Sequence, residues 1–153
     1  MAKAIATIRL LLFTAALCAA ASALADTSTP TGLWRTIDDK TGKERSLIRI
    51  SEVNGVYEGK VEKLLNRQPD DDPDNLCRKC EGARKDQPII GMTILWGLKK
   101  DGDQFGGGEI LDPKNGKIYR AKMKLVDNGT KLEVRGFIGV SLFGRSQTWV
   151  REQ

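Results

Sequence analysis

The chain contains no histidine, and this absence excludes a large part of protein chemistry. Without an imidazole there is no Ser-His-Asp or Cys-His nucleophile pair, no histidine-ligated metal and no histidine acid or base. Aromatic residues are also scarce, at 6% of the chain, and there are three cysteines. The composition therefore favours a noncatalytic protein without a cofactor, whose function depends on carboxylates, lysines, cysteines, hydroxyl groups or a pocket.

Long hydrophobic runs are missing apart from one near the beginning of the chain. Lys3 and Arg9 precede an apolar stretch at residues 10–21, and an Ala-Leu-Ala sequence ends at Ala25. A membrane-spanning helix needs roughly 20 apolar residues, whereas about a dozen followed by small residues is typical of a cleaved signal peptide. The pattern predicts a signal peptide at residues 1–25, a periplasmic or secreted location in the bacterial cell envelope, and no membrane span in the mature protein.

A strong excess of charge of one sign is absent as well. The 25 basic and 20 acidic residues give a formal charge of +5, which falls to +3 when Lys3 and Arg9 are removed with the signal peptide. Basic and acidic residues are interspersed, so binding to nucleic acid or to a membrane surface has no basic cluster to rest on. The remaining length suits one domain at residues 32–153, after a short flexible N-terminus at residues 26–31.

What the mature sequence does contain is a repeated two-residue alternation of apolar and polar side chains. The clearest case is residues 117–126, where Ala121 and Met123 alternate with Lys122 and Lys124. Asn54-Gly55 and similar pairs supply the positive φ of tight hairpin turns. The sequence predicts eight strands, at residues 32–37, 46–52, 56–64, 89–98, 104–111, 117–126, 131–138 and 145–151.

The order and spacing of these strands predict an all-β fold. Short turns join nearly all of them, so neighbours pair antiparallel, and eight strands can close into an up-and-down barrel. A two-sheet sandwich is the main alternative. The lumen of such a small barrel is filled by side chains or by one ligand. The one long connection is the loop at residues 65–88.

Cys77-Arg78-Lys79-Cys80 lies in this long loop and has three interpretations. In an exported protein a disulfide between Cys77 and Cys80 is the simplest. A redox-active pair is the second, although such motifs normally begin a helix in a thioredoxin-like fold. A zinc site is the third, but a single CxxC supplies only half of the ligands.

The same loop carries an acidic run before the cysteines. Asp70, Asp72, Asp74 and Glu81 fall at positions 1, 3, 5 and 12 of a calcium-loop count. Position 6 is Asn75, where the motif requires glycine, and no flanking helices are predicted. A solvated acidic loop is therefore favoured, and no metal site is predicted.

Three residues near the two ends of the barrel sequence are candidates for barrel closure. Trp34 lies on the first strand, and Trp149 and Arg151 lie on the last. In a closed barrel these strands are neighbours, so the guanidinium of Arg151 can lie over the Trp34 indole. The alternative is two ordinary core tryptophans and a surface arginine.

Other aromatic and methionine side chains are candidates for lining a ligand cavity. The alternation over residues 89–98 places Met92, Ile94 and Trp96 on one face. The candidates are Tyr57, Met92, Trp96, Tyr119 and Met123. Each can equally be core filling, since large apolar residues on strands most often are.

Several short motifs, taken in order, resemble the domain-of-unknown-function 2147 family. They are Gly32-x-Trp34, Cys77-x-x-Cys80, Pro88-Ile89-Ile90-Gly91, Gly107-Gly108-Glu109-Ile110, Asp112-Pro113-x-Asn115-Gly116-x-x-Tyr119, Val134-Arg135-Gly136-Phe137 and Gln147-x-Trp149-x-Arg151. The resemblance implies a small exported bacterial protein with a lipocalin-like β-barrel. It implies no established activity and supplies no catalytic residues.

Three hypotheses for function remain open at this point. The first is a noncatalytic barrel that binds a small, largely apolar ligand. The second is an envelope interaction or stress-related protein that binds no small ligand and contacts an unknown protein partner through residues 65–88. The third is a thiol-disulfide exchange protein that uses Cys77 and Cys80.

Overall fold

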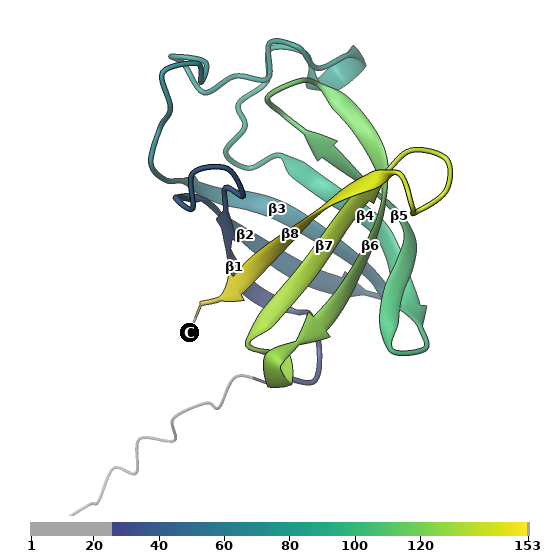
Figure 1. Cartoon of the computed structure of the whole chain (residues 1–153). Coiled ribbons are helices and arrows are strands. Elements are labelled where there is room, and N and C mark those ends of the chain that lie inside the picture. Colours follow the sequence, from purple (N-terminus) through teal and green to yellow (C-terminus); the bar gives the residue numbers. More distant parts are fainter. Residues whose placement is uncertain (1–25, 153) are drawn as a thin grey trace, which may run out of the picture.

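The computed structural model describes residues 26–152, which form an eight-stranded β-barrel (Figure 1). The predicted signal peptide lies outside the described residues. The strands are β1 (Gly32–Ile37), β2 (Glu44–Val53), β3 (Val56–Leu64), β4 (Thr93–Asp101), β5 (Gln104–Asp112), β6 (Lys117–Val126), β7 (Lys131–Phe137) and β8 (Gly144–Arg151). Two single 3₁₀ turns, η1 (Gly82–Arg84) and η2 (Asp127–Gly129), are the helical elements of this described part.

Each strand pairs antiparallel with the next, and β1 pairs with β8 to close the sheet. The closing register places Trp34 opposite Arg151 and Arg35 opposite Val150. This confirms the prediction of a closed up-and-down barrel and rejects the two-sheet sandwich. The β2–β3 hairpin turns at Asn54 and Gly55, which have φ of 53° and 78°, as expected for an Asn-Gly turn.

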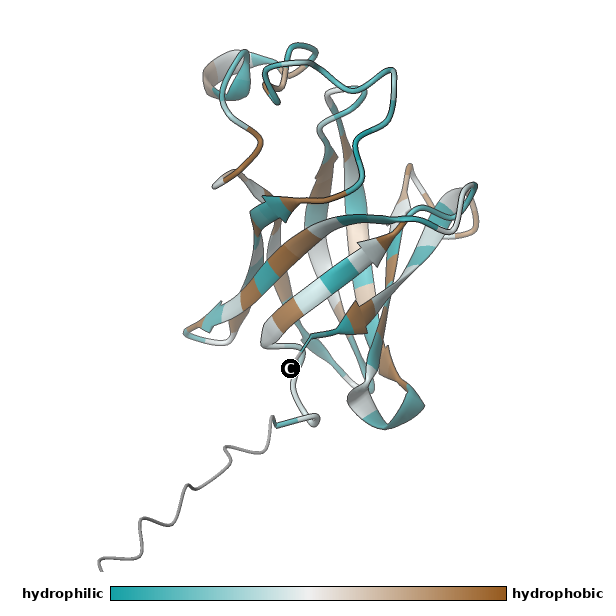
Figure 2. Cartoon of the chain, turned by 90° about the vertical axis from the view of Figure 1, so that its left-hand side faces the viewer, coloured by the Kyte–Doolittle hydropathy of each residue, from teal (hydrophilic) through white to brown (hydrophobic). Residues whose placement is uncertain are grey.

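Apolar and polar residues alternate along the strands, as the hydropathy colouring of Figure 2 shows, and buried apolar residues of the strands form the core. In β6 the predicted bounds are correct, and Ala121 and Met123 are buried while Lys124 is exposed. The other predicted strands differ from the observed ones by at most two residues at either end, except β4.

The β4 strand differs from its predicted bounds and facing. Residues 89–92 are held in a turn, in which the Gly91 N–H donates to the Val61 carbonyl, so the strand begins at Thr93. Two register shifts against β3 then interrupt the alternation, and Gly97 there has a φ of 75°. As a result Leu95 and Leu98 are fully buried, while Trp96 is only partly buried against the core cluster and donates a hydrogen bond to Glu109 on the neighbouring strand.

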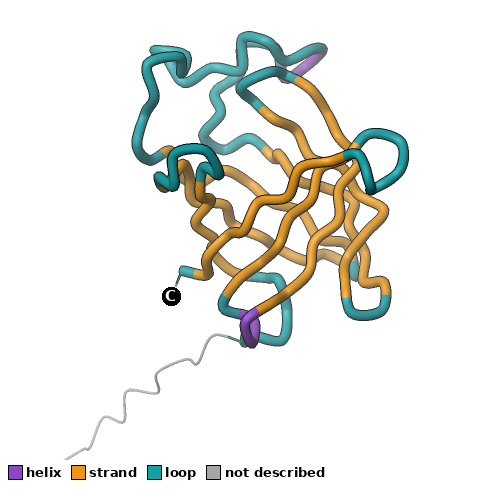
Figure 3. The backbone as a smooth tube through the Cα atoms, in the orientation of Figure 1, coloured by secondary structure: helices purple, strands orange, loops and turns teal. Residues whose placement is uncertain are grey.

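The two ends of the barrel differ in their connections (Figure 3). The short turns after β2, β4 and β6 lie at one end, which we call the closed end. The connections after β1, β3, β5 and β7 lie at the other, which we call the open end. The β3–β4 connection, residues 65–92, is the longest of these and lies over the open end.

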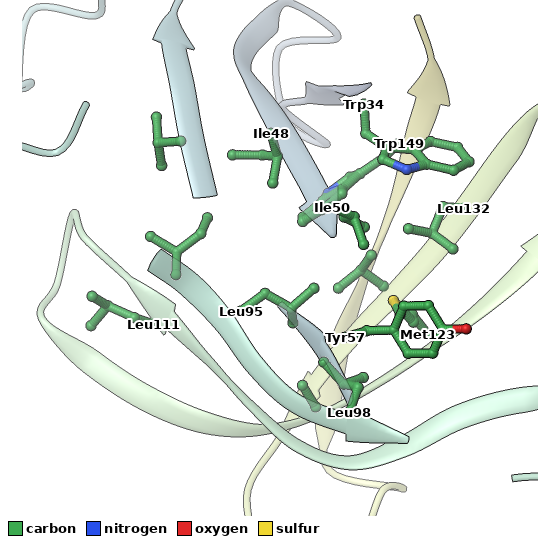
Figure 4. Packing of buried hydrophobic residues seen from close by; sticks show 14 of the residues in the cluster. Trp34, Ile48, Ile50, Tyr57, Leu95, Leu98, Leu111, Met123, Leu132 and Trp149 are labelled. Carbon is green, nitrogen blue, oxygen red and sulfur yellow. The ribbon is translucent and has the colours of Figure 1, made fainter. Parts of the chain in front are cut away.

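The half of the barrel near the closed end holds a cluster of large buried side chains, several of which Figure 4 labels. Tyr57 meets Phe105 edge to face with ring centroids 4.9 Å apart. Burial of each large apolar side chain contributes roughly 1.5–3 kcal/mol. This half of the core consists of Trp34, Ile50, Tyr57, Leu98, Phe105, Met123, Leu132 and Trp149.

The segment at residues 26–31 has contacts that the expected flexible N-terminus would lack. Pro30 is fully buried, and its carbonyl accepts a hydrogen bond from the Trp34 indole at 2.8 Å. The carbonyls of Thr29 and Thr31 accept hydrogen bonds from Arg151. Sequence reasoning missed this because small polar residues are typical of loose ends and their backbone contacts leave no pattern. The segment covers the closed end of the barrel.

Candidate ligand-binding cavity

A cavity of about 690 Å³ occupies the open half of the barrel. Its walls come from strands all round the barrel, and the loop at residues 65–88 borders its mouth. Val134 and Trp149 lie at the deep end, next to the packed core. The apolar part of the wall includes Val61, Leu64, Ile94, Ile110, Val134 and Trp149.

The cavity exists because inward-facing side chains are smaller or polar in this half of the barrel. Gly136 has no side chain to fill the space, and a Cβ there would lie 3.3 Å from Ile110 Cγ2. Thr36 and Ser46 also line the cavity, with their hydroxyl oxygens 2.8 Å apart. Core packing therefore stops partway along the lumen.

A few polar groups lie among these apolar walls. The Gln147 side-chain oxygen accepts a hydrogen bond from the Trp149 indole at 3.2 Å, which orients both side chains. The Tyr119 hydroxyl accepts a hydrogen bond from the Asn115 amide at 3.1 Å. Apolar walls with a small number of placed polar groups are typical of small-molecule sites.

Ion pairs join separate segments around the mouth of the cavity. Arg45 of β2 donates from its Nη2 to both carboxylate oxygens of Asp71 in the long loop, at 2.8 and 3.0 Å. Lys114 of the β5–β6 turn contacts Asp70 of the same loop at 2.7 Å. Arg145 of β8 pairs with Asp39 in the β1–β2 turn. These three pairs tie the connections of the open end to one another.

Asp71 is the most buried carboxylate in this network. Burial alone would raise the pKa of Asp71. Hydrogen bonds from Arg45 and from the Gln68 backbone N–H together lower it by more than burial raises it, so the pKa lies below its ordinary value. The carboxylate is therefore ionised and bound to Arg45 at neutral pH. This fixes the long loop against β2 beside the cavity.

The closed end is sealed by Arg151 and Trp34. The Arg151 guanidinium carbon lies 4.3 Å from the centroid of the fully buried Trp34 ring. Its nitrogens donate to the carbonyls of Gly129, Thr31 and Thr29 at 2.7, 2.8 and 2.7 Å. Burial lowers the pKa of Arg151, yet an arginine stays charged under ordinary conditions. Trp34 and Arg151, two of the three residues predicted for barrel closure, thus meet at the end opposite the cavity mouth, whereas Trp149 borders the cavity.

Tyr119 borders the cavity, but the other four predicted lining residues do not. Tyr57 and Met123 belong to the packed half of the core because their strand positions lie nearer the closed end. Met92 is buried beneath the long loop, in the turn before β4. Trp96 lies outside the barrel, where the Arg84 guanidinium carbon is 4.5 Å from its ring centroid. Residue type and alternation indicate inward facing but not depth along the lumen.

Cys77 and Cys80 form the predicted disulfide. Both residues are buried, with exposed fractions of 0% and 2%. The turn between β5 and β6 packs directly against this loop, and a Cβ on Gly116 would lie 1.9 Å from the Lys79 carbonyl oxygen. The disulfide therefore stabilises the loop segment that covers the top of β5 and β6.

The acidic run in the loop does not converge on a shared point. Asp70 pairs with Lys114, whereas Asp72 and Asp74 both pair with Arg78. Within residues 26–152 no group of three or more potential ligand side chains is arranged to hold a metal ion. The same part of the chain has no helix long and apolar enough to cross a membrane.

Sequence reasoning missed the residues that shape the cavity. Thr36, Ser46 and Gln147 are polar residues on strands, where their alternation with apolar neighbours suggests an outward face. The Arg45–Asp71 pair joins residues that are 26 positions apart. A strand of apolar residues interrupted by an inward polar residue near the open end is the one signal that could have pointed to a lumen.

Comparison with known proteins supports this architecture. A chain titled "Protein HP1028 from the human pathogen Helicobacter pylori belongs to the lipocalin family" superposes with a TM-score of 0.66 and 20% sequence identity, covering 80% of this chain and 82% of that one. At this identity the likeness shows the fold alone. No curated protein is significantly similar in sequence. The model of a family described as uncharacterised protein conserved in bacteria (DUF2147) matches residues 32–151. The chain therefore belongs to the DUF2147 family and has a lipocalin-like barrel.

Proposed function

We propose that this protein is an exported, noncatalytic binding protein whose barrel holds a small, largely apolar ligand. The observation that carries the proposal is the cavity of about 690 Å³ that opens beside the buried apolar core of the barrel. Ligand sites typically have volumes of about 300–1,000 Å³, and small lipocalin-like barrels characteristically hold one ligand.

The cavity wall indicates the chemistry of the ligand. Ile94, Ile110 and Val134 offer apolar contact, whereas Gln147 and the hydroxyls of Thr36 and Ser46 offer a few hydrogen-bonding groups. The charged side chains at the mouth mostly pair with each other. An amphiphile with an apolar body and one uncharged polar group matches this lining better than a highly charged metabolite.

The burial of the disulfide argues against thiol-disulfide exchange. Exchange requires a thiolate to reach one sulfur atom in line with the S–S bond, and here both cysteines are enclosed by the loop and by Pro113. A protein contact through residues 65–88 stays a prediction.

Ligand binding can be tested with the mature protein purified without detergent. Native mass spectrometry shows whether a small molecule co-purifies, and the fluorescence of N-phenylnaphthylamine reports an apolar lumen. We expect a bound mass or probe binding that oleate displaces. Absence of both in the wild-type protein would contradict the proposal.

Two matched substitutions on β7 test whether the ligand binds in the lumen. Val134 is buried against the cavity, so Val134→Trp fills it, whereas Glu133 is its exposed neighbour and Glu133→Trp leaves it open. We expect Val134→Trp to weaken probe binding at least about tenfold, a difference of 1.4 kcal/mol. Circular dichroism checks folding, and Val61→Phe fills the same space from the opposite wall. Equal binding by both β7 variants would place the probe elsewhere.

A further inference from the structure

The connection between β7 and β8 presents four exposed apolar side chains within six residues. Their exposed fractions are 68% for Ile138, 61% for Val140, 78% for Leu142 and 69% for Phe143. This loop, residues 138–143, projects from the side of the barrel at the open end (Figure 1). Contiguous exposed apolar patches on soluble domains mark surfaces that are covered by something else.

The loop is held in this projecting position by hydrogen bonds from the barrel wall. Arg135 donates to the carbonyls of Ser141 and Leu142 at 2.7 and 3.1 Å. Arg120 donates to the Gly139 carbonyl at 3.3 Å, and Lys122 lies 3.4 Å from the Ser141 hydroxyl. Arg120 and Arg135 thus anchor the loop backbone and Lys122 contacts a loop side chain, while the four apolar side chains are exposed to solvent.

These three basic side chains also give the patch a charge. Along the sequence they are interspersed with acidic residues, but the fold gathers them on adjacent strands β6 and β7 beside the loop. Within residues 26–152, Arg120, Lys122 and Arg135 form no ion pair with a carboxylate; their hydrogen-bond partners are backbone carbonyls and the hydroxyls of Ser141 and Ser146. The patch therefore combines an exposed apolar tip with a net positive charge, although Glu109 lies opposite Arg120 on β5.

We propose that residues 138–143 dock the barrel on an anionic lipid surface. A convex apolar tip inserts into the acyl boundary of a bilayer, and basic side chains behind it meet the lipid phosphates. The basic side chains next to this tip outnumber the carboxylate of Glu109, which lies opposite Arg120, and this net positive charge favours an anionic lipid surface. Ile138 and Phe143 also border the cavity, so docking places the cavity mouth at the lipid surface.

The proposal is tested by co-sedimentation with vesicles of phosphatidylcholine alone and of phosphatidylcholine mixed with phosphatidylglycerol. We expect the wild-type protein to bind the mixed vesicles preferentially and to dissociate at high salt, because screening weakens the electrostatic part. The double variant Leu142→Ser/Phe143→Ser should bind at least about tenfold more weakly. A matched control, Val53→Ser/Ile90→Ser, removes two exposed apolar side chains elsewhere and should bind like the wild type.

Fluorescence gives a second readout, which reports whether the tip enters an apolar environment when the protein binds vesicles. Tryptophan placed by Phe143→Trp should shift its emission to shorter wavelength on mixed vesicles, whereas tryptophan placed by Val53→Trp, at the end of β2, should not shift. No vesicle binding by the wild type, or equal binding by the double serine variant, would overturn the proposal. Sedimentation of a dimer that this variant abolishes would assign the tip to a second copy instead. Lipid docking needs no ligand, so the Val134→Trp variant should still bind vesicles.

Discussion

At the scale of single residues, Arg151 connects several separate segments at the closed end of the barrel. It joins the last strand to the N-terminal segment, to the η2 turn and to the face of Trp34. Arg151→Met would keep the aliphatic stem but leave three carbonyl oxygens without their donor. We expect a loss of about 2–4 kcal/mol in the free energy of unfolding, measured by urea denaturation.

A matched arginine tests whether this loss is specific. Arg49 forms an exposed ion pair with Glu62 on the neighbouring strand. Arg49→Met should cost less than about 1 kcal/mol, because exposed ion pairs contribute little. Similar losses for both variants would mean that the Arg151 contacts contribute no more than a surface pair.

Gly116 gives a second prediction at this scale. Its φ is 74°, and a Cβ would lie 1.9 Å from the Lys79 carbonyl oxygen, so the backbone of the disulfide loop fills that space. Gly102 also has a positive φ, 60°, but no atom lies within 4 Å of its Cβ position. Gly102→Ala should cost about 1 kcal/mol from backbone strain alone, and Gly116→Ala clearly more. Thermal unfolding measures both, and equal costs would contradict the close contact.

Individual residues also show where prediction from sequence fails. Trp34 and Arg151 could be paired from the sequence because barrel closure makes their strands neighbours whatever the detailed packing. Trp96 could not be placed, since an extra residue in a strand reverses the facing of every later residue in that strand, and bulges leave no strong sequence signal.

At the scale of elements, the long β3–β4 connection depends on its ion pair with β2. The pKa of Asp71 in the folded protein lies below the reference value of 3.8. A depressed carboxylate pKa stabilises the fold above the unfolded-state pKa, and this contribution disappears as the pH falls through the folded-state pKa. The attachment of the loop should therefore be complete at pH 5 and be lost only well into the acid range.

The comparison of wild type with Asp71→Asn isolates this contribution. We expect the variant to be less stable by about 1–3 kcal/mol between pH 7 and 5, and the difference to shrink as the pH falls below 3.8. Thermal unfolding across this pH series provides the measurement. Asp101→Asn, on an exposed residue at the closed end, is the control. A difference that grows on acidification would contradict the assignment.

Elements were the most predictable level of this structure. Hairpin turns with Asn-Gly or Asp-Gly pairs mark the strand ends locally, and the two-residue period marks each strand. The length of the β3–β4 connection could be predicted from the sequence, but its path over the open end could not. Its path depends on Arg45, Lys114 and the buried disulfide, which come from three separate segments.

At the scale of the whole molecule, the barrel has a solid half and a hollow half. Local stability follows packing, so amides in the packed half should exchange most slowly with solvent. Hydrogen exchange with mass spectrometry should show slow exchange at residues 50–57 and 123–132 and faster exchange at 110–119 and 134–147. Bound ligand should slow the hydrogen exchange of residues 110–119 and 134–147. Uniform protection in the ligand-free protein would contradict the division.

The cavity was the least predictable feature at this scale. Its position depends on how far inward side chains extend from opposite walls, and Gly136 and Ile110 limit it from strands that do not pair. Alternation shows which residues face inward, but the space left between them is a property of the assembled barrel. The exposed loop at residues 138–143 was likewise invisible as a surface until the fold gathered basic side chains behind it.

The contact between Arg151 and the Thr31 carbonyl spans 120 positions of the sequence. No local hairpin can form it, so the first and last strands must meet across almost the whole length of the barrel sequence. Until that moment a newly made chain is an open sheet with two unpaired borders and a bare indole at Trp34. Pairing of β1 with β8 therefore competes with aggregation of the chain through its unpaired strand edges.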